Sequence, residues 1–136
     1  MRALPLLAFA LIAFVSASAT GAGTASRTSL TITFWADGSK TSEKTVWTLR
    51  CNPAGGTLKR PAVACERIAT GGWKLFAPVK DGTVCTQIYG GPQTALIVGT
   101  VQGRRVWAKF QRRNGCEISR WNRVSPWLLP PGGVTS

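Results

Sequence analysis

The chain has 136 residues, a length that suits a single domain of ordinary size. It carries 17 Lys and Arg against 5 Asp and Glu, and the resulting net charge of +12 favours acidic or anionic partners without indicating a fold. It contains no histidine. A Ser-His-Asp triad, a Cys-His pair and a histidine general base are therefore excluded, and with them most hydrolases.

The sequence offers little for other kinds of catalysis. Two carboxylates would suffice for a glycosidase, but the five acids are better explained as surface or capping groups; they are Asp37, Glu43, Glu66, Asp81 and Glu117. The phosphate-binding motif G-x-x-x-x-G-K-[ST] does not occur. We therefore expect a protein that is not an enzyme and needs no cofactor.

Residues 1–19 have the features of a secretory signal peptide. A basic start at Arg2 is followed by an apolar run over residues 3–15 and by the small residues Ala17-Ser18-Ala19, which suit cleavage after Ala19. A second acceptable cleavage site follows Ala25. The apolar run is shorter than the ~20 residues that span a bilayer. We expect a secreted, extracellular protein with no stable membrane anchor.

Four cysteines follow this segment, at Cys51, Cys65, Cys85 and Cys116. In an oxidising compartment they are expected to form two disulfides. Three pairings are possible, and the spacing alone does not choose among them. A zinc site would need a different pattern, because the chain has neither a Cys-x-x-Cys pair nor a histidine. No metal site is expected.

Alternating apolar residues predict two strands in the first half of the chain. Leu30, Ile32 and Phe34 share one face of the first, which ends at the turn Asp37-Gly38-Ser39. The same alternation over residues 45–51 predicts the second strand.

A helix and a hairpin complete the predicted elements. Pro61 is well placed to open a helix over residues 62–69, which Gly71-Gly72 would end. Residues 95–101 are nearly all apolar or β-branched, residues 105–110 alternate, and Gln102-Gly103 can turn the chain between them, which predicts a β-hairpin. Strands with a helix between them indicate an α+β protein with an antiparallel sheet. From the prolines and glycines near the end we expect a flexible tail over residues 129–136.

Two blocks around the cysteines resemble those of a known family. The segment T-L-R-C-N-P-A-G-G-T-L-K-R-P-A-V-A-C-E-R-I, residues 48–68, is similar to the first disulfide block of the Streptomyces subtilisin inhibitors. C-T-Q-I-Y-G-G-P (85–92), V-Q-G-R-R-V (101–106) and F-Q-R-R-N-G-C-E (110–117) resemble that family's reactive segment, hairpin and final cysteine. The hairpin has Val101 where the family usually shows Trp, and the Gly-Gly-Pro stretch holds one residue more than the usual Asp-Pro.

The resemblance implies a fold and an assembly. It implies a subtilisin inhibitor-like domain over residues 30–128, built on an antiparallel sheet of about five strands with one or two short helices. It implies the disulfides Cys51–Cys65 and Cys85–Cys116, and a homodimer joined through sheet faces.

The resemblance also implies a function and a site. The chain would block a serine protease with a rigid, substrate-like loop whose reactive bond, the peptide bond offered to the protease, joins Gln87 to Ile88. The expected protease-contact residues are Val84, Cys85, Thr86, Gln87, Ile88 and Tyr89. Because Gln87 is neutral, we expect a subtilisin-like target rather than a trypsin-like one.

A cationic binding module is the alternative function. In it, the same fold would hold a polyanion or an acidic surface partner, because aromatic and basic side chains together suit stacking and phosphate contact. The candidate aromatic residues are Trp35, Trp47, Trp73, Trp107, Trp121 and Trp127. A nucleic-acid partner is not expected for an exported chain.

Overall fold

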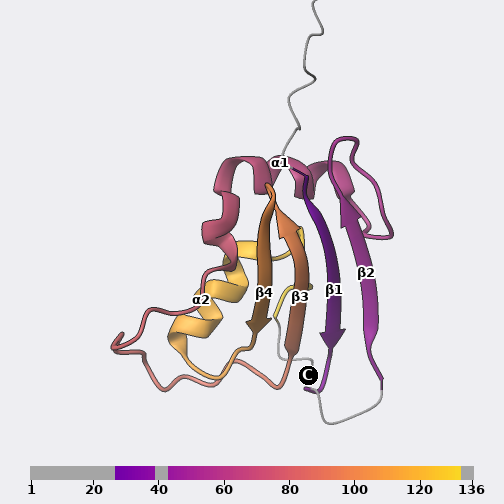
Figure 1. Ribbon diagram of the computed structural model, residues 1–136. Coiled ribbons are helices and arrows are strands. Elements are labelled where there is room, and N and C mark those ends of the chain that lie inside the picture. Colours follow the sequence, from indigo (N-terminus) through magenta and orange to yellow (C-terminus); the bar gives the residue numbers. More distant parts are fainter. Residues whose placement is uncertain (1–26, 39–42, 133–136) are drawn as a thin grey trace, which may run out of the picture.

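The computed structural model describes residues 27–38 and 43–132 (Figure 1). The predicted signal peptide, residues 1–19, and the alternative cleavage site after Ala25 lie outside these residues. Within the described ranges, no helix has the length and apolar character needed to cross a membrane.

Four strands form one antiparallel sheet in the order β2-β1-β3-β4. Their bounds are Ser29–Trp35 for β1, Thr45–Arg50 for β2, Thr94–Val101 for β3 and Arg104–Phe110 for β4. With two α-helices packed on the sheet, the predicted α+β class is confirmed. The expectation of about five strands is one too many for the part of the chain that the structure describes.

The strands form where the predicted alternation lies. Leu30 and Ile32 of β1 are buried, while Ser29 and Thr31, which alternate with them, are exposed. The hairpin of β3 and β4 turns at Gln102 and Gly103, whose φ angles of 50° and 79° fit the left-handed geometry of a tight hairpin turn.

The first helix, α1 (Pro61–Gly71), begins at the predicted proline and extends two residues beyond the predicted end. Gly72 has φ 62°, a conformation that glycine adopts at little cost and that ends the helix. The chain then forms a short 3₁₀ helix, η1 (Gly72–Phe76), which the sequence analysis did not identify. Its Trp73 ring lies under the guanidinium of Arg104, 3.8 Å from the ring centroid.

The second helix, α2 (Gly115–Val124), begins directly before the last cysteine. The side chain of Asn114 accepts a hydrogen bond of 3.0 Å from the Glu117 N–H, which satisfies one of the free amides at the start of the helix. Trp121 and Val124 are buried against the sheet. The resemblance allowed for a second short helix, and this is where it lies.

The prediction of a flexible tail over residues 129–136 is wrong for residues 129–132. Leu128 and Leu129 are 2% and 1% exposed, and the Trp121 indole N–H donates a 2.8 Å hydrogen bond to the Pro130 carbonyl. The prolines and glycines stop the chain from continuing as a helix, yet the apolar side chains between them still pack into the core. Residues 133–136 lie outside the described residues.

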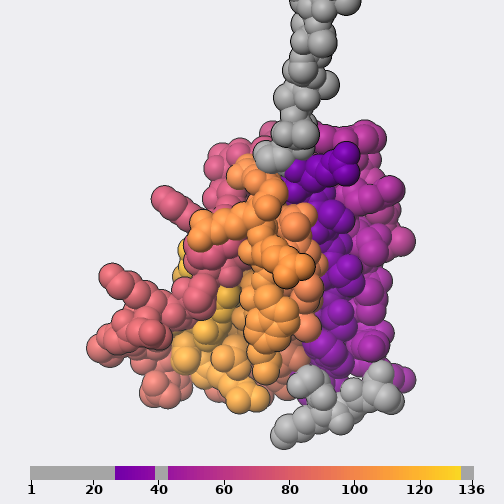
Figure 2. All heavy atoms as spheres, viewed as in Figure 1, coloured from indigo at the N-terminus to yellow at the C-terminus, as the bar shows by residue number. Residues whose placement is uncertain are grey.

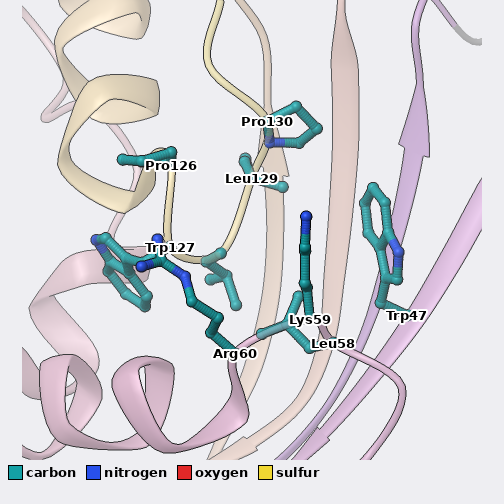
Figure 3. A pocket seen from close by; sticks show the side chains of 9 residues that line it. Trp47, Leu58, Lys59, Arg60, Pro126, Trp127, Leu129 and Pro130 are labelled. Carbon is teal, nitrogen blue, oxygen red and sulfur yellow. The ribbon is translucent and has the colours of Figure 1, made fainter.

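This C-terminal segment also lines a cavity of about 570 Å³ (Figure 3). Trp127, Leu129 and Pro130 line it from one side, and Trp47 of β2 lines it from the other. The residues before α1, Leu58 to Arg60, complete the wall.

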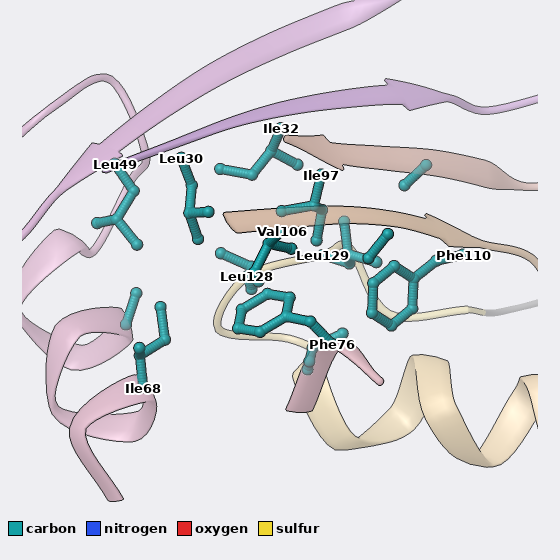
Figure 4. Packing of buried hydrophobic residues seen from close by; sticks show 14 of the residues in the cluster. Leu30, Ile32, Leu49, Ile68, Phe76, Ile97, Val106, Phe110, Leu128 and Leu129 are labelled. Carbon is teal, nitrogen blue, oxygen red and sulfur yellow. The ribbon is translucent and has the colours of Figure 1, made fainter. Parts of the chain in front are cut away.

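The hydrophobic core fills the space between one face of the sheet and the elements packed on it (Figure 4). Ile32, Ile97 and Phe110 project from the strands, and Ile68 of α1 and Leu129 of the C-terminal segment belong to the same buried cluster. Within residues 27–38 and 43–132, no helix packs on the opposite face of the sheet, and its strands lie uncovered in Figure 2.

Candidate functional site

A long loop, residues 77–93, joins η1 to β3 and contains neither helix nor strand. It projects from the body of the molecule on the side of α2 (Figures 1 and 2). All six predicted contact residues lie on it. Val84 is 96% exposed, and Ile88 and Tyr89 are 61% and 65% exposed, although apolar side chains of this size are ordinarily buried. The loop thus presents apolar groups to solvent.

The loop is anchored just upstream of the Gln87–Ile88 bond. Cys85 forms a disulfide with Cys116, the second residue of α2, with the two Cα atoms 5.4 Å apart. The Gly115 N–H donates a 2.9 Å hydrogen bond to the Thr86 carbonyl. The approach is close, since a Cβ atom on Gly115 would lie 2.0 Å from the Thr86 hydroxyl oxygen. The start of α2 therefore holds Cys85 and Thr86 in place.

A second anchor lies just downstream of the bond. The Gly90 N–H donates a 2.7 Å hydrogen bond to the Arg112 carbonyl, and the Arg112 guanidinium donates to the Gly90 carbonyl. The segment between the anchors, from Gln87 to Tyr89, has no backbone-to-backbone hydrogen bond to the other residues that the structure describes.

A third contact fixes the beginning of the loop. Arg120 of α2 is 4% exposed and donates from Nε to the Ala77 carbonyl at 2.9 Å. Its Nη1 donates to the Lys109 carbonyl at 3.1 Å and forms a 2.7 Å ion pair with Glu117. Because a charge this deeply buried needs several partners, α2, β4 and the loop are joined at one point.

Within the exposed stretch, the Gln87 side chain folds back on the loop. Its Nε2 donates a 3.2 Å hydrogen bond to the Cys85 carbonyl. The contact lies in solvent and is exchanged readily for water, so the side chain is free to turn outward when a partner binds.

The other disulfide, Cys51–Cys65, lies away from the loop, where it joins the end of β2 to α1 with a Cα separation of 5.6 Å. Both disulfides have the pairing that the resemblance implies. None of the described residues forms a group of three or more His, Cys, Asp and Glu side chains able to hold a metal ion.

The exposed part of the site and its disulfide tether, Cys85–Cys116, were predicted from the resemblance, but the other supports of the loop were not. Gly115, Arg112 and Arg120 were not among the predicted residues. A signal for the first was present, because Asn114 followed three residues later by Glu117 is a typical helix start, which would have placed the cysteine on a helix. Nothing in the sequence marks Arg112 or Arg120 among the other basic residues.

Residues 24–114 match the family described as subtilisin inhibitor-like. The chain belongs to the subtilisin inhibitor-like family. The matched region contains the whole loop and three of the four cysteines, and ends just before α2. The helix that supports the loop and the C-terminal segment therefore lie beyond the matched residues.

Two curated proteins are similar to this member of the family. "Protease inhibitor SIL-V5" of Streptomyces luteoverticillatus is 35% identical over 74 residues, which are 52% of this chain and 68% of the relative. "Subtilisin inhibitor-like protein 1" of Streptomyces cacaoi is 38% identical over 77 residues, 54% of this chain and 69% of the relative. Among solved structures, Streptomyces caespitosus sermetstatin, crystallised in complex with Bacillus licheniformis subtilisin, is 32% identical with a TM-score of 0.49, covering 76% of this chain and 97% of that chain.

Proposed function

We propose that this protein is a secreted, substrate-like inhibitor of subtilisin-type serine endopeptidases, with Gln87–Ile88 as its reactive bond. The observation that carries the proposal is the projecting loop, whose exposed residues lie between two anchors to the body of a subtilisin inhibitor-like domain.

The loop suits binding in a protease cleft. An extended segment pairs its backbone with the edges of the cleft while alternate side chains enter pockets, so the main chain supplies affinity and the side chains supply specificity. Here the Thr86 carbonyl already accepts a hydrogen bond from the Gly115 N–H. Holding the loop before binding avoids part of the ordering cost of association, roughly 0.5–1.5 kcal/mol for each side chain that would otherwise be immobilised.

The same anchors explain why cutting would be unproductive. If the protease cleaved Gln87–Ile88, the new carboxyl end would remain tied to α2 through Cys85–Cys116 and the Gly115 hydrogen bond. The new amino end would remain tied through Gly90. Because neither end could diffuse away, the bond could re-form.

The side chain of Gln87 favours a subtilisin-like target. Trypsin-like enzymes carry a buried carboxylate in the primary pocket, and a neutral amide beside it would leave that charge uncompensated at a cost of several kcal/mol. Subtilisin-like enzymes have a broader, less charged pocket and accept an apolar residue three positions upstream, where this chain has the exposed Val84.

The test is a titration of the purified mature protein against subtilisin and trypsin. We expect stoichiometric inhibition of subtilisin, little inhibition of trypsin, and slow cleavage at Gln87–Ile88 that sequencing of the products identifies. Gln87→Pro should abolish inhibition. Gln87→Leu is the matched control, because it changes the same side chain and should retain inhibition. Subtilisin inhibition that survives Gln87→Pro would place the contact loop elsewhere.

Export completes the proposed function, because both the target and the disulfides require an extracellular protein. We propose that residues 1–19 direct secretion and are removed after Ala19, or that cleavage follows Ala25. N-terminal sequencing of protein recovered from the culture medium tests this, with Thr20 or Ser26 expected as the first residue. Intact protein retained in the cells would contradict it.

We also propose a homodimer that forms through the uncovered face of the sheet. Three side chains of this face are apolar and exposed: Val46 at 46%, Val98 at 39% and Trp107 at 70%. Val98 and Trp107 are direct partners in the pairing of β3 and β4, so they form one continuous patch. A second copy of the same face is a suitable cover for it.

The alternative of a cationic binding module has less support from the side chains. Trp121 is fully buried and Trp127 is 8% exposed, and of the six tryptophans Trp107 alone is largely exposed. One exposed indole does not make a stacking platform of the kind that binds single-stranded polyanions.

A further inference from the structure

Arg112 is a buried cation whose partners are uncharged oxygens. The residue is 7% exposed. Its Nη1 donates to the Gly90 carbonyl and, at 3.3 Å, to Oε1 of Gln93, and its Nη2 donates to the Gly132 carbonyl at 3.3 Å. The guanidinium thus joins the chain just downstream of the proposed reactive bond to the C-terminal segment.

Glycines surround this guanidinium closely. A Cβ atom on Gly132 would lie 2.0 Å from the Arg112 Cζ atom, and one on Gly91 would lie 3.3 Å from Nη1. A Cβ on Gly90 would lie 2.8 Å from the Ile118 side chain of α2. The space therefore fits a planar guanidinium and little else, so the position of the Arg112 side chain is well defined.

Stability alone does not explain this arrangement. The Nε–H of Arg112 is buried without a hydrogen-bond partner among the described residues, and a buried cation with an unpaired N–H costs free energy. Such local costs in natural proteins tend to occur where function requires them.

The two ends of the reactive segment are held by different means. The upstream end has a covalent anchor, Cys85–Cys116. At the downstream end, the hydrogen bonds that hold Gly90 to the rest of the described chain come from Arg112, through its backbone carbonyl at 2.7 Å and its guanidinium.

We propose that Arg112 is the positioning residue for the downstream half of the reactive bond, so that after cleavage the new amino group of Ile88 stays beside the Gln87 carbonyl and the peptide bond re-forms. The inference rests on the proposed function and deepens it. Cleavage adds one water across the Gln87–Ile88 bond, and re-formation by the bound protease releases it, so the ratio of cut to intact protein at equilibrium measures how well the two ends are held together.

The experiment compares Arg112→Met with Arg113→Met, a matched control that removes the same charge from the exposed neighbouring residue. Each protein is incubated with a catalytic amount of subtilisin, starting once from intact and once from cleaved inhibitor, until mass spectrometry gives the same ratio from both directions. Because a hydrogen bond to a charged group is lost, we expect Arg112→Met to raise the ratio of cut to intact protein about tenfold and to weaken inhibition by a similar factor. Arg113→Met should match the wild type.

A purely structural role would lower the unfolding temperature of Arg112→Met and leave the ratio unchanged, which would overturn the inference. Gly132→Ala is a second variant if Arg112→Met does not fold, because its added methyl displaces the guanidinium without removing it. It should raise the ratio in the same direction, and an unchanged ratio would again overturn the inference. The wild-type protein distinguishes the failure of the proposed function from the failure of this inference. If the wild type is not cut at Gln87–Ile88, both proposals are wrong. If it is cut there and the variants have the same ratio of cut to intact protein, only the inference about Arg112 is wrong.

Discussion

At the scale of single residues, the close contact between Gly115 and Thr86 makes a sharp prediction. In Gly115→Ala, the added Cβ would lie 2.0 Å from the Thr86 hydroxyl oxygen, so the loop must shift to accommodate it. We expect inhibition to weaken by about tenfold or more, because displacing a preorganised loop raises its ordering cost. Removing the hydroxyl at the same time, in Gly115→Ala combined with Thr86→Ala, should restore part of the loss. An inhibition constant that does not change in Gly115→Ala would contradict the proposed support.

The side chain at position 87 makes a second prediction at this scale. Gln87→Lys should convert the protein toward trypsin, because the cation meets the carboxylate of that pocket. Gln87→Leu and Gln87→Met should tighten subtilisin inhibition. Gln87 must give up its hydrogen bond to the Cys85 carbonyl and its solvation when it enters the pocket, whereas an apolar side chain has neither to lose. Inhibition constants against both proteases measure the change. Equal effects on the two enzymes would argue against Gln87 as the primary side chain.

At the scale of elements, the two disulfides have separable roles. Cys51–Cys65 joins β2 to α1 across 14 positions, away from the loop, and Cys85–Cys116 joins the loop to α2 across 31. Replacing either pair by alanine should lower the free energy of unfolding by roughly 3–4 kcal/mol. Only the loss of Cys85–Cys116 should turn the inhibitor into a substrate that is cut rapidly and not resealed.

The measurement is a urea unfolding curve for each double alanine variant, followed by inhibition and cleavage assays under conditions where both remain folded. Cys51→Ala with Cys65→Ala is the matched control, because it removes a bridge without touching the loop. If this control also became a substrate, general stability rather than local tethering would determine resistance to cleavage.

The helix α2 supports the upstream half of the loop at two points. Its first two residues, Gly115 and Cys116, hold the loop near the reactive bond, and Arg120, just over one turn later, holds the beginning of the loop at Ala77. Its other face, with Trp121, packs into the core. The upstream half of the loop is therefore coupled to the core through one helix, whereas the downstream half is held by Arg112, which precedes that helix.

At the scale of the whole molecule, the charge of the protein opposes the proposed dimer. Two strongly basic copies repel each other, and salt screens this repulsion, so we expect the dimer to tighten as the salt concentration rises. Binding to a polyanion would weaken under the same change. Sedimentation at micromolar concentration over a range of salt distinguishes the two modes of association.

Trp107→Lys should give a monomer in that experiment, because it places a further cation in the apolar patch, directly beside Val98. The replacement lies on the uncovered face of the sheet and is not one of the residues that anchor the loop, so it should leave protease inhibition unchanged. A dimer that persists in this variant would place the interface on another surface.

Local patterns in the sequence were sufficient for the positions of the strands. Alternation at Leu30 and Ile32 and the Gln102-Gly103 turn depend only on neighbouring residues, so β1 and the hairpin lie where they were predicted. The exposed stretch was located differently, by the resemblance of the motif around Cys85 to the reactive segment of the subtilisin inhibitors.

The supports of the loop and the ordered C-terminal segment were decided by tertiary structure. Arg112 meets Gly90 and Gly132 from distant parts of the chain, and no local pattern distinguishes it from an exposed arginine. Leu129 lies two residues after Trp127, in a proline-rich stretch whose composition is typical of a flexible tail. It is nevertheless buried, because its side chain packs beneath the sheet. Short-range periodicity determines which segments become strands. Contacts between remote residues determine which charged side chains are buried, and these buried side chains determine how firmly the loop is held.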